Sequence, residues 1–180
     1  MRLIDKLIIH CSYTPPSQDI GVETIRRWHT APRFNDATGT YMFKGAKYSS
    51  TEALPAEARM LGNGNGWTDI GYHFVITRGA RVEVGRSVVI PGAHTKGHNK
   101  HSIGICMVGG MDPDTRHPAT NFTHLQQTAL QALCKRLVLD YPITSIKGHK
   151  HYAPDRECPC FDVQLDHLLA FSGMGDGCER

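Results

Sequence analysis

The chain alternates between short apolar runs and segments with helical periodicity. The apolar runs are typical of buried strands and lie at residues 6–10, 71–76, 102–108 and 145–148. A turn at residues 77–80 leads into residues 81–85, which predicts a hairpin. The amphipathic segments lie at residues 22–29, 123–140 and 163–171. Strands interleaved with helices predict an α/β layer fold.

The segment at residues 123–140 carries the clearest helix signals. Thr123 stands where an N-cap is expected, and Pro142 ends the helical pattern. The apolar stripe of this helix comprises Leu130, Leu133, Leu137 and Val138. We therefore expect it to pack against the sheet.

Residues 31–65 differ from the rest of the chain, because they are rich in Gly, Asn, Ser and Thr. Only residues 50–61 have a helical pattern, with Ser50 or Thr51 as a candidate N-cap and Pro55 interrupting it. We interpret the region as a long insertion within a single domain that spans residues 1–180. A loop of this length is usually functional or mobile, so our hypothesis is that it lines or covers a binding groove.

Composition narrows the function classes. The 180 residues are 40% hydrophobic and 21% charged, which excludes a disordered or collagen-like chain. No apolar run reaches the roughly 18 to 20 residues of a membrane span. The net charge of +3 is too small to indicate a nucleic-acid partner.

The chain is rich in the two side chains that bind soft metals, with 11 His and 6 Cys. No secretory signal precedes the first strand, which favours reduced thiols over a disulfide framework. Cys11, Cys106 and Cys134 are expected in the core, and Cys178 is expected to be exposed.

Two histidines and one cysteine follow predicted strands and form a candidate metal site. His10 ends the first apolar run, His149 directly follows the last one, and Cys158 comes nine residues later. Sites of α/β proteins gather at such strand ends, and these ligands suit tetrahedral zinc with one open position. The residues alone leave a structural role open for each histidine, and Cys160 could also ligate or pair with Cys158.

Four ordered motifs resemble those of zinc-dependent N-acetylmuramoyl-L-alanine amidases. Residues 66–74 read GWTDIGYHF and resemble the family segment GWxDIGYHF. Residues 92–99, which run into 102–105, look like the segment GAHxxGxNxxSIGI. Residues 9–12 and 148–162 are similar to the two metal-bearing ends. The pattern resembles that of the small phage lysis amidases and of the peptidoglycan recognition proteins.

The resemblance implies a mixed sheet of five to six strands with helices on both faces and a zinc site at the mouth of a groove. One Zn²⁺ per chain would be held by His10, His149 and Cys158. Tyr72 would orient or deprotonate the attacking water. Arg156 stands where relatives carry Lys or Thr and would stabilise the oxyanion. Its planar guanidinium would replace the ammonium group of lysine in this role.

The resemblance also implies a substrate-binding groove floor formed by His94, Thr95 and Asn99, although loop hydrogen bonding is an alternative role. Lys150 is a second candidate for stabilising the oxyanion, because the spacing between the second and third ligands varies among relatives. A structural role is expected for three further residues, His73, Asp69 and Asp162. Surface or helix positions are expected for the remaining histidines, His29, His98, His101, His117, His124, His151 and His167.

The expected function is that of an endolysin, which hydrolyses the amide between N-acetylmuramic acid and L-alanine in the peptidoglycan glycopeptide. Such an enzyme would be a monomer made in the host cytoplasm, and it would reach the periplasmic wall through a separate pore. Two alternatives share the fold. One is a cytosolic amidase that recycles soluble muropeptides, and the other is a non-catalytic peptidoglycan-binding module.

Overall fold

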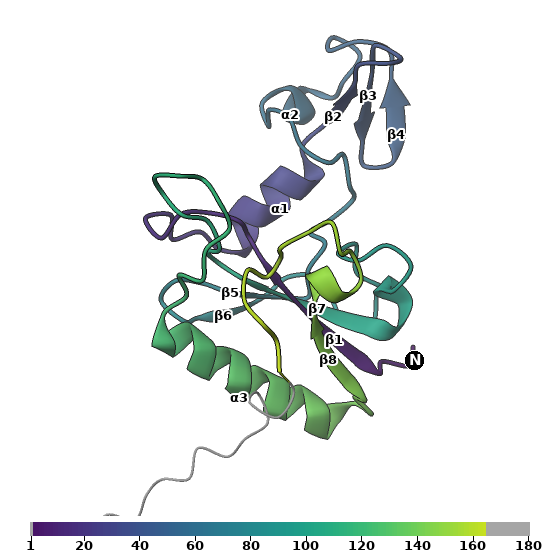
Figure 1. Ribbon diagram of the computed structural model, residues 1–180. Helices are drawn as coiled ribbons and strands as arrows, with labels where there is room; N and C mark the ends of the chain where they lie inside the picture. Colours follow the sequence, from purple (N-terminus) through teal and green to yellow (C-terminus); the bar gives the residue numbers. More distant parts are fainter. Residues whose placement is uncertain (1, 165–180) are drawn as a thin grey trace, which may run out of the picture.

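A mixed five-stranded sheet forms the centre of the protein (Figure 1). The computed structural model describes residues 2–164, so most of the helix expected at 163–171 lies outside the described residues, as do His167 and Cys178. The strand order is β6-β5-β7-β1-β8. The strands are β1 (Lys6–Cys11), β5 (Phe74–Ile76), β6 (Val82–Val84), β7 (Ser102–Met107) and β8 (Ser145–Gly148). All neighbours pair in parallel except the β5–β6 hairpin, which confirms the expected mixed sheet.

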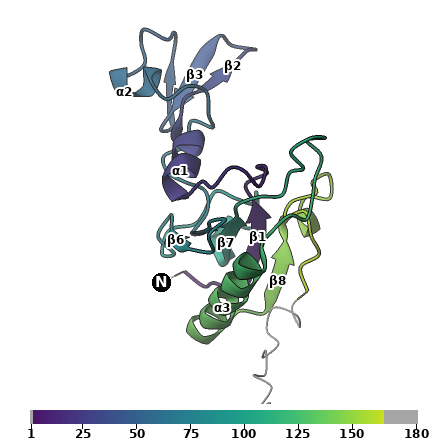
Figure 2. The same ribbon diagram turned by 90° about the vertical axis from the view of Figure 1, so that its left-hand side faces the viewer.

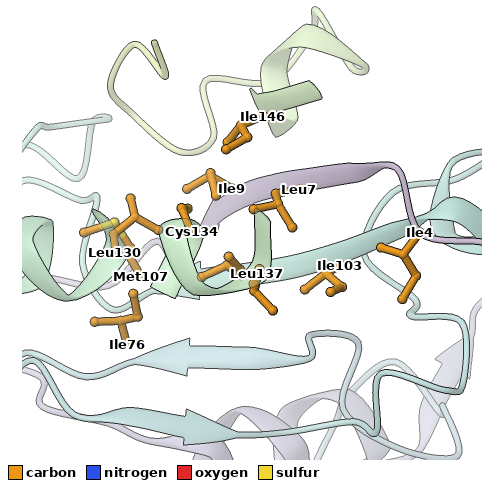
Figure 3. Packing of buried hydrophobic residues seen from close by; sticks show 11 residues of the cluster. Ile4, Leu7, Ile9, Ile76, Ile103, Met107, Leu130, Cys134, Leu137 and Ile146 are labelled. Atoms are coloured by element: carbon orange, nitrogen blue, oxygen red, sulfur yellow. The ribbon is translucent and has the colours of Figure 1, made fainter. Parts of the chain in front are cut away.

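Helices cover both faces of the sheet, as expected. Helix α3 (His124–Asp140) packs on one face, where its apolar stripe meets the odd-numbered positions of β1 and β7 (Figure 3). Helix α1 (Val22–Thr30) packs on the other face against Cys106 and Val108. Because side chains alternate along a strand, His10 and Gly104 belong to the α1 face. The central strands are covered on both sides, which explains their continuous apolar runs.

The start of α3 is a complete capping box. The Thr123 side chain accepts a hydrogen bond from the Gln126 backbone N–H at 3.1 Å, and the Gln126 side chain accepts one from the Thr123 N–H at 3.0 Å. Gln126 is buried, and its Nε2 also donates to the carbonyl of Val108 at 2.9 Å. The cap therefore fixes the helix to the end of the central strand.

The region of residues 31–65 contains secondary structure that the sequence pattern did not indicate. Three antiparallel strands form a second sheet in the order β2-β3-β4, comprising β2 (Arg33–Asn35), β3 (Thr40–Phe43) and β4 (Ala46–Tyr48). Gly39 and Gly45 adopt positive φ in the two connecting turns. This backbone conformation is unfavourable for most residues with a Cβ atom. In both views this small sheet extends beyond α1, away from the central sheet (Figures 1 and 2).

The expected helix over residues 50–61 is wrong in extent. Only α2 (Ala56–Arg59) is helical, and it begins directly after Pro55 because proline is tolerated at a helix start but not in its interior. A small cluster of Phe43, Leu54 and Ala58 holds this helix to the three strands.

The parallel register brings the predicted ligands together. Ile9 of β1 lies opposite Gly148 of β8, so His10 and His149 leave neighbouring strands at the same edge. Two short 3-10 helices complete this edge, η1 (Asn99–His101) and η2 (His149–His151). Among the described residues, no helix has the length and apolar character needed to cross a membrane.

Candidate metal centre and groove

The three predicted ligands converge at the carboxyl edge of the sheet. The ligand atoms of His10, His149 and Cys158 all lie within 4.8 Å of one another. The two imidazole rings have centroids 4.6 Å apart, and Cys158 Sγ lies 3.8 Å from Nδ1 of His10. The chain after β8 brings Cys158 back to β1, where the backbone N–H of Cys11 donates to its sulfur at 3.3 Å.

The protonation of this group suits metal binding. Burial lowers the pKa of His10, so its ring is neutral and offers a lone pair at neutral pH. Hydrogen bonding from the Cys11 thiol lowers the pKa of Cys158 and favours the thiolate. Two imidazoles and one thiolate are a donor set that could hold a metal ion, with one position left open.

Cys160 does not join the candidate ligands. Its sulfur lies 3.6 Å from the sulfur of Cys11, so the pairing considered with Cys158 is replaced by a contact with β1. Cys106 and Cys134 are buried, as expected, and burial raises the pKa of each thiol. These thiols are therefore protonated and unsuited to metal binding.

Tyr72 faces the candidate metal group. Its ring centroid lies 5.1 Å from that of His10, whereas the neighbouring His73 uses Nδ1 to accept from the Gly104 N–H at 2.9 Å. His73 is fully buried, in agreement with its expected structural role. Burial raises the pKa of Tyr72 well above its usual value. The phenol therefore keeps its proton at neutral pH and can donate a hydrogen bond.

Arg156 lies at the opening beside Tyr72 and His149. Its side chain is 65% exposed, and the only ion pair within reach among the described residues is a long one of 3.8 Å with Asp155. Lys150 instead pairs with Asp162 at 2.6 Å on the outside of the loop. The structure therefore favours Arg156 over Lys150 as the cation at the site.

An open groove of about 680 Å³ runs past the candidate metal group. We call it the main groove, and its lining residues are His29, Asn65, Trp67, Tyr72, Ala93, His94, Thr95, Lys96, Asn99, His149, Tyr152, Ala153, Asp155 and Arg156. A second pocket of about 430 Å³ shares Tyr72, His149, Asp155 and Arg156 with it and reaches Cys158. The candidate metal ligands therefore lie where the main groove and the second pocket meet. An elongated substrate could pass across it.

Comparison with known proteins decides the family. The family model of N-acetylmuramoyl-L-alanine amidases matches residues 1–161. This chain is a member of that family. The endolysin of Escherichia phage T7 is 35% identical to this amidase over 160 residues, which cover 89% of this chain and 83% of the relative. The endolysin of Enterobacteria phage T3 is 34% identical over the same coverage.

A solved structure has the same fold. The N-acetylmuramoyl-L-alanine amidase LysC from Clostridium intestinale aligns with a TM-score of 0.58 at 22% identity, covering 92% of this chain and 82% of that one. The arrangement of sheet and helices in this amidase is therefore the family fold.

The three residues predicted to bind substrate all line the main groove of the amidase. Their polar atoms also have partners within the protein. Asn99 Oδ1 accepts from the backbone N–H groups of His94 and Thr95, both at 2.9 Å. His94 Nδ1 lies 3.0 Å from Nε2 of His10. The loop hydrogen bonding that we considered as an alternative is thus present together with the groove position.

His29 was expected at a surface or helix position; it lies in α1 and also belongs to the groove wall. Its Nδ1 accepts from the Gly71 N–H at 3.0 Å, and its ring packs 4.8 Å from Trp67 and 5.3 Å from Tyr72. Burial lowers the pKa of His29 to about 4. No local pattern identified this residue, because the contact joins the end of α1 to a segment more than forty residues later. Its position beside two aromatic residues became evident only in the structure.

Proposed function

We propose that this protein is a zinc-dependent endolysin that hydrolyses the amide between the lactyl group of N-acetylmuramic acid and L-alanine. The observation that carries the proposal is the convergence of His10, His149 and Cys158 within 4.8 Å beside a groove, in a chain of the amidase family. Their chemistry fits the ion, because both imidazoles and a thiolate are preferred zinc ligands. When bound, zinc supplies Lewis-acid chemistry for hydrolysis at neutral pH.

Tyr72 and Arg156 would act on the reacting groups from either side of the opening. The protonated Tyr72 hydroxyl can hold the attacking water through a hydrogen bond and then donate to the oxyanion. The guanidinium of Arg156 offers several N–H donors to the same oxyanion. Its exposure leaves it free to approach the substrate when the groove is filled.

The main groove would hold the glycopeptide. His94, Thr95 and Asn99 form part of its wall, and Trp67 and Tyr152 supply aromatic surface on which a sugar or peptide can pack. The similarity to phage endolysins favours intact wall peptidoglycan over soluble muropeptides as the substrate. We further propose a monomer that is made in the host cytoplasm and reaches the wall through a separate pore.

The test combines product analysis with metal analysis. Purified protein should reduce the turbidity of isolated sacculi and release peptides whose new amino terminus is L-alanine, which mass spectrometry can identify. Wild-type protein should contain about one zinc per chain, and Cys158→Ser should lose both zinc and lysis. Cys134→Ser is a matched control, because this buried thiol lies away from the site. Lysis that persists after chelation, or zinc-loaded protein that releases no such peptide, would refute the proposal.

A further inference from the structure

We propose that His94 is a positioning residue that holds the His10 imidazole in the tautomer and orientation needed for metal binding. This inference rests on the proposed metal site and assigns His94 a role in addition to forming the groove wall. It is carried by the hydrogen bonds of the two rings and by the packing around His94.

The two nitrogens of His10 face different partners. Nδ1 lies on the side of Cys158, 3.8 Å from its sulfur, whereas Nε2 lies 3.0 Å from Nδ1 of His94. The nitrogen that binds a metal must carry a lone pair, so the proton of a neutral His10 belongs on Nε2. His94 Nδ1 then accepts that proton in a hydrogen bond, which fixes both the tautomer and the tilt of the ligand ring.

The hydrogen bonds beyond His94 agree with this direction. If Nδ1 of His94 is an acceptor, its proton lies on Nε2, which faces Ser102 Oγ at 3.4 Å. Ser102 Oγ donates to the backbone carbonyl of His98 at 2.9 Å, so its lone pairs are available to His94. Thr95 Oγ1 lies within 3.4 Å of both imidazoles and can support the same arrangement. Each donor in this series of hydrogen bonds, from His10 through His94 to Ser102, therefore has an acceptor. The series ends at the backbone carbonyl of His98.

Packing holds the His94 ring in place without help from the metal. The residue is only 9% exposed, and a Cβ atom at Gly104 of β7 would come within 2.5 Å of its Cδ2 atom. A Cβ atom at Gly92 would come within 2.4 Å of the same atom. The imidazole thus packs directly against two glycine backbones. The backbone N–H of His94 in turn donates to Asn99 Oδ1. Such a rigid ring can orient a neighbour before the ion arrives.

A pair of substitutions separates hydrogen bonding from simple volume. In His94→Asn the side-chain oxygen is attached to Cγ, as Nδ1 is, so an acceptor for His10 is retained. In His94→Gln the oxygen lies one bond further out, near the former Nε2 position, and that acceptor is displaced. Both variants keep a polar side chain in the space between the glycines, so they differ mainly in whether His10 keeps its partner.

The experiment measures the zinc dissociation constant by competition with a chromophoric chelator, using full-length protein at constant pH. We expect His94→Gln and His94→Ala to weaken zinc binding by about 10- to 100-fold, the usual effect of losing a hydrogen-bond partner of a metal ligand. His94→Asn should recover most of the affinity. His101→Ala is the matched control from the same segment and should bind zinc as the wild type does. Thermal unfolding of the metal-free variants verifies that each is folded.

The outcomes distinguish the positioning role of His94 from the proposed function of the protein. Wild-type zinc affinity in a folded His94→Gln, or equal losses in the Asn and Gln variants, would overturn the positioning role while leaving the proposed function intact. If His94→Ala does not fold, the Asn and Gln variants still decide the question. A wild-type protein that binds no zinc would overturn the proposed function and this inference with it.

Discussion

The central sheet and the three-stranded sheet of residues 33–48 are built in opposite ways. Strands β1 and β7 are buried along almost their whole length and pair with partners about 30 to 140 residues away. Strands β2, β3 and β4 pair only with their neighbours in sequence, and most of their residues are exposed or half-buried. The proposed chemistry gathers on the first sheet, because only parallel strands bring distant residues to one shared edge.

Backbone hydrogen bonds bring the two ends of the insertion together at its base. The N–H of Gly64 donates to the carbonyl of Pro32 at 2.8 Å, and the N–H of Gly66 donates to that of Ala31 at 2.7 Å. Of the range 31–65, only Asn65 is among the residues that line the main groove. The insertion therefore contributes to the groove only through its last residue, Asn65, which is followed closely by the lining residue Trp67. Four predictions test this division.

Removing a tyrosine hydroxyl should lower activity beside the candidate metal site but not in the insertion. We expect Tyr72→Phe to lower kcat by about 100-fold or more while zinc content stays unchanged, because a positioned proton donor typically contributes 10²- to 10⁴-fold. Tyr41→Phe is the matched control in the insertion, where the hydroxyl accepts a hydrogen bond from Thr51 at 3.0 Å. Initial rates of peptide release compare the two variants. Equal activity in both would remove Tyr72 from the mechanism.

Truncating the two cores should have unequal effects on unfolding. Leu7 is fully buried under α3, so Leu7→Ala should lower the free energy of unfolding by about 2 to 5 kcal/mol. Leu54 belongs to the small cluster of the insertion, so Leu54→Ala should open that region locally with a smaller effect on the whole protein. Urea unfolding, together with hydrogen exchange of each region, distinguishes them. A loss of the same size for Leu54→Ala would show that both regions unfold as one.

Acid should weaken the central domain before the insertion. Burial lowers the pKa of both His29 and His73 to about 4, below the value of about 6.5 expected in the unfolded chain. The unfolded state therefore binds more protons between these values. Stability is fully present above pH 6.5 and falls as the pH decreases towards 4.

Hydrogen exchange between pH 7 and 4 measures this effect. Residues 31–65 contain no histidine, so their local opening should be less sensitive to this range. His29→Asn keeps an acceptor for Gly71 and should reduce the pH dependence of the melting temperature. A slope unchanged from that of the wild type would contradict the assignment of His29.

Deleting the insertion should have the smallest effect on the metal site. Because Gly64 N and Pro32 O are hydrogen-bonded, a short Gly-Ser linker can replace residues 33–63. We expect unchanged zinc content and a KM for glycopeptide altered several-fold, through the loss of support for Asn65 and Trp67. Kinetics on intact sacculi and on soluble muropeptides measure the change. Unchanged kinetics on both substrates would exclude a role for the insertion in the groove.

Much of the central fold followed from local patterns. The apolar runs predicted β1 and β7 because these strands are buried on both faces, and Thr123 marked the start of α3 as its N-cap. The insertion was harder to predict, because strands with exposed residues have no continuous apolar run. Its turns depend on glycines with positive φ that also suit an irregular loop. The same ambiguity made residues 50–61 resemble one longer helix.

The α/β class, the ends of the main strands and the candidate ligands His10, His149 and Cys158 could be predicted from the sequence. Local periodicity and a resemblance to a family are properties of short segments, so neither depends on how the chain folds in space. Which side chains share a surface depends instead on tertiary contacts. Parallel register placed His10 beside His149, and the closing loop turned Cys160 towards Cys11 while leaving Cys158 at the site. The space above Gly104 allowed His94 to reach His10, a contact between residues 84 positions apart that no local pattern encodes.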